Sequence, residues 1–177
     1  VVVGATGFVW QGLFNFYELY METKGLADAT AKNLLTVIFA AGVPAFFISG
    51  RLTDRLPRVP YILVIIGSFT VSVLVLTVTT GLVPILVLTA VIGYVIHSLF
   101  PAIDTYLLDT LPDETRASAY AWYSGGMMVV QATGSSAVGT LRELGLAYDA
   151  IFTQLALGLA VVVVGLVVFQ QAGRLPQ

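Results

Sequence analysis

The chain has 177 residues, of which 58% are hydrophobic and only 10% are charged, and its formal net charge is -2. Soluble globular proteins carry about 25% charged residues, so this composition excludes an ordinary soluble enzyme and a disordered chain. The slight negative charge argues against nucleic-acid binding, which needs a basic face. The chain contains no cysteine and a single histidine, so we expect no disulfide, no metal site and no cofactor.

Long stretches of the chain contain no Lys, Arg, Asp or Glu. These stretches are residues 1–17, 33–50, 59–103, 117–141 and 150–173. A helix of about 20 apolar residues crosses the roughly 30 Å hydrocarbon layer of a bilayer, so four stretches each fit one crossing. Residues 59–103 are too long for one, and they divide at the turn signal around Gly81 and Pro84.

The pattern therefore predicts an all-α membrane protein with six transmembrane helices and no separate soluble domain. Only helices satisfy their backbone hydrogen bonds within one segment in lipid. The expected helices are residues 2–20, 30–50, 60–79, 84–108, 117–141 and 148–172.

Basic residues predict the orientation, because cytoplasmic loops are enriched in Lys and Arg. If both ends of this segment are cytoplasmic, the cytoplasmic side carries five basic residues: Arg51, Arg55, Arg58, Arg116 and Arg174. The outer side then carries three: Lys24, Lys32 and Arg142. We expect this arrangement in a plasma or inner membrane. The chain starts with Val and shows no signal peptide, so we also expect it to begin inside a longer protein.

The first residues, VVVGATGFV, also resemble the glycine-rich turn of a dinucleotide-binding unit. Trp10 occupies the place of its third glycine, and no alternating strands and helices follow. We therefore expect Gly4 and Gly7 to allow close helix packing instead.

The loop after the second expected helix, SGRLTDRLPR at residues 49–58, resembles a signature of the major facilitator superfamily. That signature is a Gly, three residues, Asp-Arg, one residue, a second Gly and then basic residues. The matching positions are Gly50, Leu52, Asp54, Arg55 and Arg58. Pro57 stands in place of the second Gly, which makes the turn stiffer.

Residues 111–120, LPDETRASAY, resemble the family's loop between the fourth and fifth helices of a half, with Arg116 beginning the next helix. The resemblance covers the whole chain and implies one six-helix half, the C-terminal one, of a twelve-helix transporter that moves a small-molecule substrate. The N-terminal half would then be a partner absent from this chain. The implied cytoplasmic gating motif comprises Gly50, Asp54, Arg55, Arg58, Asp109, Glu114 and Arg116. In it, we expect Arg55 or Arg58 to pair with Asp109 or Glu114.

Polar residues form stripes on two expected helices, and polar groups inside a membrane usually mark function. Gln11, Asn15 and Glu18 recur at helical spacing on the first helix, and His97 and Asp104 do so on the fourth. The family resemblance separately implies that the first and fourth helices line a central cavity. We therefore predict that these five residues line a substrate or proton path.

Plainer interpretations stay open for each feature. Glu18 could be a solvated interfacial residue, His97 could hydrogen-bond a neighbouring helix, and Asp104 could be structural. The Arg-rich loop could be an ordinary cytoplasmic loop, and the whole chain could be a membrane scaffold or enzyme subunit. On the fifth helix, residues 124, 128, 132, 136 and 140 recur every four positions, with Ser135 and Gly139 alongside, which predicts a packing face of mostly small residues.

Overall fold

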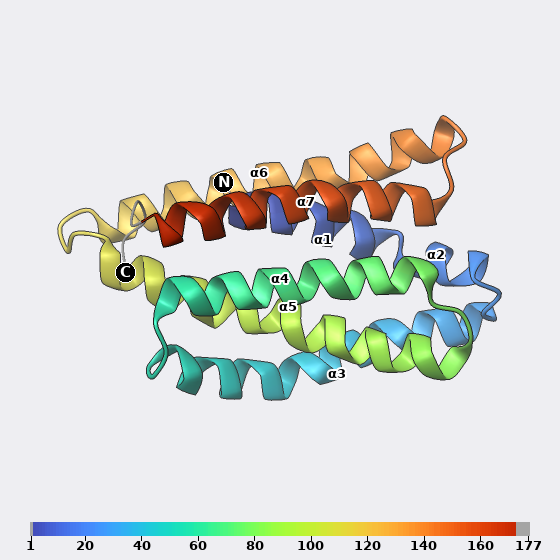
Figure 1. The fold of residues 1–177 in the computed structure, drawn as a ribbon, viewed down its shortest axis with the longest axis horizontal. Coiled ribbons are helices and arrows are strands. Elements are labelled where there is room, and N and C mark those ends of the chain that lie inside the picture. Colours follow the sequence, from blue (N-terminus) through green and yellow to red (C-terminus); the bar gives the residue numbers. More distant parts are fainter. Residues whose placement is uncertain (1, 173–177) are drawn as a thin grey trace.

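The computed structural model describes residues 2–172, and these form seven helices with no strand among them (Figure 1). The helices are α1 (Val2–Asn15), α2 (Tyr17–Thr23), α3 (Asp28–Thr53), α4 (Arg58–Val78), α5 (Leu82–Thr110), α6 (Arg116–Glu143) and α7 (Tyr148–Gln171). Arg174, which we assigned to the cytoplasmic side, lies outside the described residues.

Five of the expected helices are single helices whose ends differ from the expected ones by at most three residues. The first expected helix is different, because it breaks at Phe16 into α1 and α2. No Pro or Gly stands at the break. Instead, the residues on either side are held by different helices: the Asn15 amide donates to Ser135 of α6, and Tyr17 bonds Thr89 of α5.

The long helices run side by side in an elongated bundle (Figure 1). α3 packs mainly on α5, α1 packs mainly on α6, and α4 contacts both α5 and α7. The α3–α4 and α5–α6 connections lie at one end, and α2 with the other two long-helix connections lies at the opposite end. The predicted turn between α4 and α5 is present, and Gly81 takes a positive φ of 85° there, which favours glycine.

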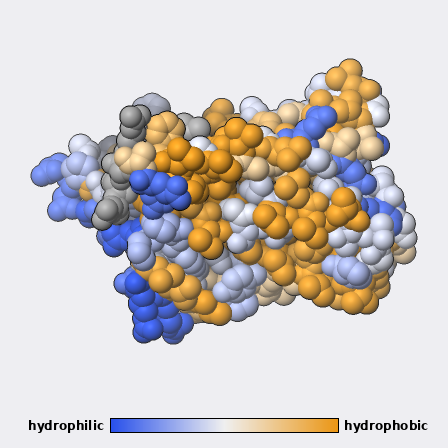
Figure 2. All heavy atoms as spheres, in the orientation of Figure 1, coloured by the Kyte–Doolittle hydropathy of each residue, from blue (hydrophilic) through white to orange (hydrophobic). Residues whose placement is uncertain are grey.

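Four helices are long and apolar enough to cross a membrane: α3, α4, α5 and α7. The break at Phe16 leaves α1 and α2 too short when each is taken alone, and α6 is more polar than the other long helices. Length and composition therefore do not establish the six-span count. Large apolar side chains such as Phe47, Val64 and Val161 lie mostly exposed, and Figure 2 shows hydrophobic residues over much of one face, with hydrophilic residues mainly toward its ends. This surface fits a lipid environment.

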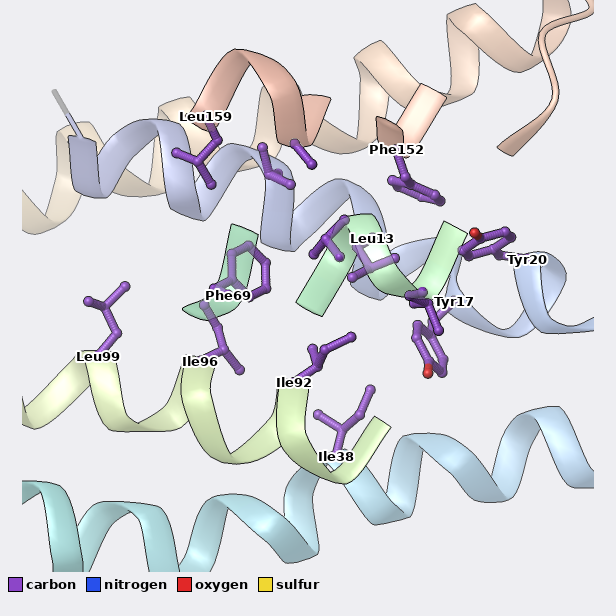
Figure 3. Close-up of a cluster of buried hydrophobic side chains, with 14 of the residues drawn as sticks. Leu13, Tyr17, Tyr20, Ile38, Phe69, Ile92, Ile96, Leu99, Phe152 and Leu159 are labelled. Atoms are coloured by element: carbon purple, nitrogen blue, oxygen red, sulfur yellow. The ribbon is translucent and has the colours of Figure 1, made fainter. Parts of the chain in front are cut away.

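The core contains side chains from most of the helices (Figure 3). Leu13 and Tyr17 meet Phe69 of α4, Ile92 of α5 and Phe152 of α7 in one buried cluster. Lipid tails are as apolar as these side chains, so close van der Waals packing, rather than escape from water, holds such helices together.

Glycines allow two pairs of helices to approach closely. A Cβ at Gly134 of α6 would collide with the Phe8 carbonyl oxygen of α1, and one at Gly93 of α5 would collide with the Ile38 backbone of α3. A Cβ at Gly12 would lie 2.8 Å from Val138 Cγ2. These positions therefore fix how near α1 lies to α6, and α3 to α5.

Only one side of the predicted packing face of α6 meets α1: Ser135 bonds Asn15 and the Gln11 backbone, and Gly139 lies beside Phe16. Met128 is 71% exposed, and Ala132, Ser136 and Thr140 are also exposed. The buried residues of α6 are Gly134 and Val138. Small residues occur on several faces of this helix, so a repeat of small residues alone did not identify the face that meets α1.

We expect Gly134→Val to destabilise the protein by about 1–3 kcal/mol, the usual cost of overpacking. The added side chain would meet backbone, which yields less easily than a side chain. The midpoint of thermal unfolding of the purified protein in detergent measures the effect. Gly126→Val, on the same helix, is the matched control, since a Cβ at Gly126 would meet no atom within 4 Å. Equal losses in both variants would contradict the assigned contact.

Candidate functional site

A cavity of about 230 Å³ lies between α1, α5 and α6. Its polar lining comes from α5 and α6: Asp104, Tyr120, Tyr123, Ser124 and Gln131. The remaining wall is apolar and aromatic and includes Trp10, Phe100, Met127 and Met128. The cavity therefore combines one carboxylate with aromatic rings and a few neutral polar groups.

Asp104 is the predicted site residue that lines this cavity. The Tyr120 hydroxyl of α6 donates a 2.8 Å hydrogen bond to Asp104 Oδ1. Hydrogen bonds to an ionised acceptor are stronger than neutral ones, so this contact fixes the carboxylate without supplying a positive charge. Among residues 2–172, Asp104 takes part in no ion pair.

The contribution of α6 to this cavity was not predicted from the sequence. Tyr120, Ser124, Gln131 and Ser135 are separated by four, seven and four residues. At about 100° per residue they fall within roughly 60° of one face, so their spacing carried a signal as strong as those on the other two helices. This polar spacing was overlooked because the small residues of α6 were interpreted as a packing face.

Gly4 and Gly7 lie in helix α1 and face α6, in agreement with the expected packing role. A Cβ at Gly7 would lie 2.7 Å from the Gln131 Cγ, and one at Gly4 would approach Val130 and Met127. Gly7 therefore leaves the space in which the Gln131 side chain lies beside the cavity.

The Asn15 side chain and the Gln11 backbone contact α6 outside this cavity. The Asn15 amide donates to the Ser135 hydroxyl at 2.5 Å, and that hydroxyl donates to the Gln11 carbonyl oxygen at 3.2 Å. Gln131 and Ser135 lie one helical turn apart on α6. The polar stripe of α1 therefore meets the polar face of α6 just beyond the cavity.

Glu18 lies apart from the cavity, in an exposed acidic group at the other end of the bundle. Its carboxylate is 3.7 Å from Lys32 Nζ, and Lys32 also pairs with Asp28 at 2.7 Å. Carboxylate oxygens of Glu18, Glu22 and Asp28 lie within 4.8 Å of one another. Lys32 already supplies positive charge to two of these acids, which accounts for their proximity.

His97 is buried behind the cavity wall. Its Nδ1 donates to the Gly93 carbonyl oxygen at 2.7 Å within α5. Its ring meets Trp10 edge-on at 6.4 Å and Phe100 at 6.0 Å between centroids, and both of those residues line the cavity. A Cβ at Gly42 of α3 would lie 2.7 Å from His97 Cγ. His97 thus contacts the cavity through two aromatic side chains.

The residues of the predicted gating motif lie at the end of the bundle where α3 meets α4 and α5 meets α6 (Figure 1). One of the expected pairings is present: Arg58 at the start of α4 forms an ion pair with Asp109 near the end of α5. Arg116 instead pairs with Asp113 in its own connection. Asp54, Arg55 and Glu114 are exposed, and Gly50 is half-buried with open space beside it.

Asp54 lies in the connection between α3 and α4, where an acidic residue directly before a helix can accept hydrogen bonds from its first N–H groups. In this bundle it follows the last residue of α3, and the residue preceding α4 is Pro57, which makes no capping bond. Asp54 therefore does not cap α4, and its carboxylate is exposed at the end of the bundle.

At the opposite end of the bundle, Lys24 joins three helices. The sequence predicted only that this residue lies on the outer side. The Lys24 side chain is 5% exposed and pairs with Asp149 at 3.0 Å. It also donates to the carbonyl oxygens of Thr77 and Thr79, and the Tyr20 hydroxyl donates to Asp149. This lysine clamp joins the end of α2 to the end of α4 and the start of α7.

The apolar exposed sides, the charged ends and the carboxylate-bearing cavity between helices define an integral membrane protein with a polar site inside its bundle. A sequence model described as the Major Facilitator Superfamily matches residues 1–175, and the chain belongs to that superfamily. Its members are transporters rather than enzymes, so the chain is a transporter of the major facilitator type. The search of curated proteins found no match.

We expect Lys24→Met to lower the free energy of unfolding by about 1–3 kcal/mol, because two partly buried carbonyl oxygens lose their donor and Asp149 loses its ion-pair partner. Urea or thermal unfolding in detergent measures this change. Lys32→Met is the matched control, since Lys32 is 54% exposed in side-chain area and such surface pairs contribute about 0–1 kcal/mol. A larger loss from Lys32→Met would contradict the clamp.

Proposed function

We propose that this chain forms one six-helix half of a secondary active transporter, which moves a small solute by alternating access between two bundles. The observation that carries the proposal is the cavity between α1, α5 and α6, where Asp104 faces aromatic and neutral polar side chains. Two of these helices are the first and fourth spans, which the family resemblance assigns to the central path. A second bundle facing them would complete the wall.

The chain has six spans when α1 and α2 are taken together as the first. Together they cover Val2 to Thr23 with a break at Phe16. α6 is the fifth span, and its polarity is the expected property of a helix that borders a water-filled path. Helices broken within the membrane often occur at substrate sites in transporters, which supports the same assignment for α1 and α2.

The end bearing the Arg-rich loop is assigned to the cytoplasm, in a plasma or inner membrane, with the amino and carboxyl ends of this segment on that side. Arg51, Arg55, Arg58 and Arg116 lie at that end, whereas Lys24, Lys32 and Arg142 lie at the opposite one. The excess of basic residues follows the usual bias of cytoplasmic loops.

The cytoplasmic residues would act as a latch between the two halves. The Arg58–Asp109 pair holds α4 against α5 within this half, so these helices would move as a unit. Asp54 and Arg55 are exposed and are the groups that this half offers to the other. Such contacts would form when the cytoplasmic side closes and break when it opens.

Solute movement would be coupled to protons. Asp104 lies at the cavity, His97 lies behind Trp10, and Glu18 lies at the outer end, while Gln11 and Asn15 lie between Glu18 and the cavity. Protonation of Asp104 would remove the negative charge from the cavity and change its affinity for a charged solute. The proton path would thus run from Glu18 at the outer end along the α1–α6 contact to Asp104, with His97 beside it on α5.

Uptake by the full-length protein in proteoliposomes, with a panel of solutes and an imposed pH gradient, tests this function. We expect at least one solute to accumulate, and we expect Asp104→Asn to reduce gradient-driven uptake about tenfold or more, because an amide cannot take up and release a proton as a carboxyl group does. Gln170→Asn, at the end of α7, is the control.

If Glu18→Gln, His97→Ala and Asp104→Asn all leave the pH dependence of uptake unchanged, the proposed proton coupling is wrong. A complete lack of uptake would favour a scaffold.

A charge exchange tests separately whether the Arg58–Asp109 pair, which holds α4 against α5 at the latch end, contributes to gating. We expect Arg58→Asp to slow transport severalfold, because its carboxylate would repel Asp109, and we expect Arg58→Asp with Asp109→Arg to restore most of the rate. The chain has no cysteine, so Ser124→Cys offers a single labelling site in the cavity. Its rate of labelling from the cytoplasmic side should change with the first substitution and recover with the second. Failure of the exchange to restore either measurement would contradict a role of the Arg58–Asp109 pair in gating.

A further inference from the structure

The cavity carries a negative charge that the described part of the protein does not neutralise. Two arginines at the same end of the bundle are each paired with another acid: Arg58 with Asp109 and Arg116 with Asp113. Asp104 receives its hydrogen bond from the neutral Tyr120 hydroxyl. Among the described residues that line the cavity, none is Lys, Arg or His. An anionic solute would therefore meet an uncompensated carboxylate.

The walls around this carboxylate favour a cation with an apolar body. Trp10, Phe100 and Tyr123 present aromatic rings to the cavity, and Met127 and Met128 add polarisable thioethers. Aromatic faces attract cations within about 6 Å of the ring centroid, and quaternary ammonium groups are commonly recognised in this way. Thioethers suit irregular apolar surfaces and adapt to more than one shape.

Other solutes fit these groups less well. A sugar needs several hydrogen-bond partners, whereas the neutral polar groups beside Asp104 are few and one of them, Tyr120, already donates to it. A metal ion such as Mg²⁺ or Ca²⁺ needs about six oxygen ligands, and Asp104 is the only carboxylate among the described lining residues. A quaternary ammonium group needs no hydrogen bond and therefore leaves the Tyr120–Asp104 contact in place.

We propose that this cavity binds a small organic monocation, with Asp104 as its counter-ion and Trp10, Phe100 and Tyr123 as its aromatic wall. The inference rests on the proposed transport function and names the class of its substrate. The volume of about 230 Å³ is below the roughly 300–1,000 Å³ of drug-sized ligand pockets. The cavity therefore suits the charged head of a small ammonium compound, with the facing half covering its other side.

Binding of benzyltrimethylammonium to the full-length protein in nanodiscs tests the charge preference. Phenylmethanesulfonate has a similar size and the opposite charge. Neopentylbenzene is the neutral isostere of benzyltrimethylammonium. The three compounds therefore separate the effect of charge from apolar partitioning. We expect saturable binding of the cation only. Asp104→Asn should weaken it about tenfold or more, as the loss of a partly buried charge partner does, whereas Glu143→Gln, an exposed acid at the far end of α6, should not. Equal binding of the anion, or unchanged affinity in Asp104→Asn, would overturn the proposal.

Trp10 provides a second test that does not remove the charge. Trp10→Phe keeps an aromatic ring and should weaken cation binding severalfold at most, whereas Trp10→Leu should weaken it about tenfold or more, because cation–π contacts strengthen when they are desolvated. Equal affinities in the two variants would overturn the aromatic part of the proposal. These variants also serve if Asp104→Asn does not fold.

Uptake measured in parallel separates this proposal from the function on which it rests. Cation binding without accumulation of any solute would support the site and contradict transport. Accumulation of a neutral or anionic solute, without cation binding, would support transport and overturn the cation preference. Accumulation of benzyltrimethylammonium that Asp104→Asn abolishes would support both.

Discussion

The structure depends on close contact between helices in a solvent that does not drive them together. Apolar side chains gain little by leaving lipid for the core, so association requires backbones to approach where side chains are absent. Gly134 brings α6 to the Phe8 backbone, and Gly93 brings α5 to the Ile38 backbone. The Gly134 contact also sets one side of the site, because the cavity lies where α1, α5 and α6 meet, whereas the Gly93 contact holds α5 against α3. The spacing that holds the bundle together is therefore the spacing that leaves room for a solute.

The same helices satisfy polar groups with one another instead of with water. Ser135 bonds both Asn15 and the Gln11 backbone, and Tyr120 bonds Asp104. Polar contacts between membrane helices contribute modestly, roughly 0.6 kcal/mol on average. Their value here lies more in position than in stability, since each one sets the direction of a side chain beside the cavity. Their small energies also allow these contacts to exchange when the helices move.

Much of the helical architecture followed from the sequence, because the distribution of charged residues is a strong signal at the scale of a membrane crossing. Five expected helices appear with nearly the expected ends, and Gly81 makes the expected turn. The break at Phe16 was not predictable, since no Pro or Gly marks it and the nearby contacts come from α5 and α6. The site was only partly predictable. Spacing placed Asp104 and His97 on one face, but the depth of each residue relative to the cavity depends on how the helices pack.

α6 shows why composition and function diverge in such a protein. It has the polar groups that a path requires, and those same groups make it the long helix that does not qualify as a span by apolarity. Its glycines and serines suit both packing and solvation, so a sequence pattern alone cannot assign its faces. The contacts assign them: Gly134 and Val138 are buried against α1, and Tyr120, Ser124 and Gln131 face the cavity. The role of each face of a helix that both packs and lines a cavity is thus shown by the residues it contacts. The polar residues that lower the apolarity of α6 are the ones that define the site.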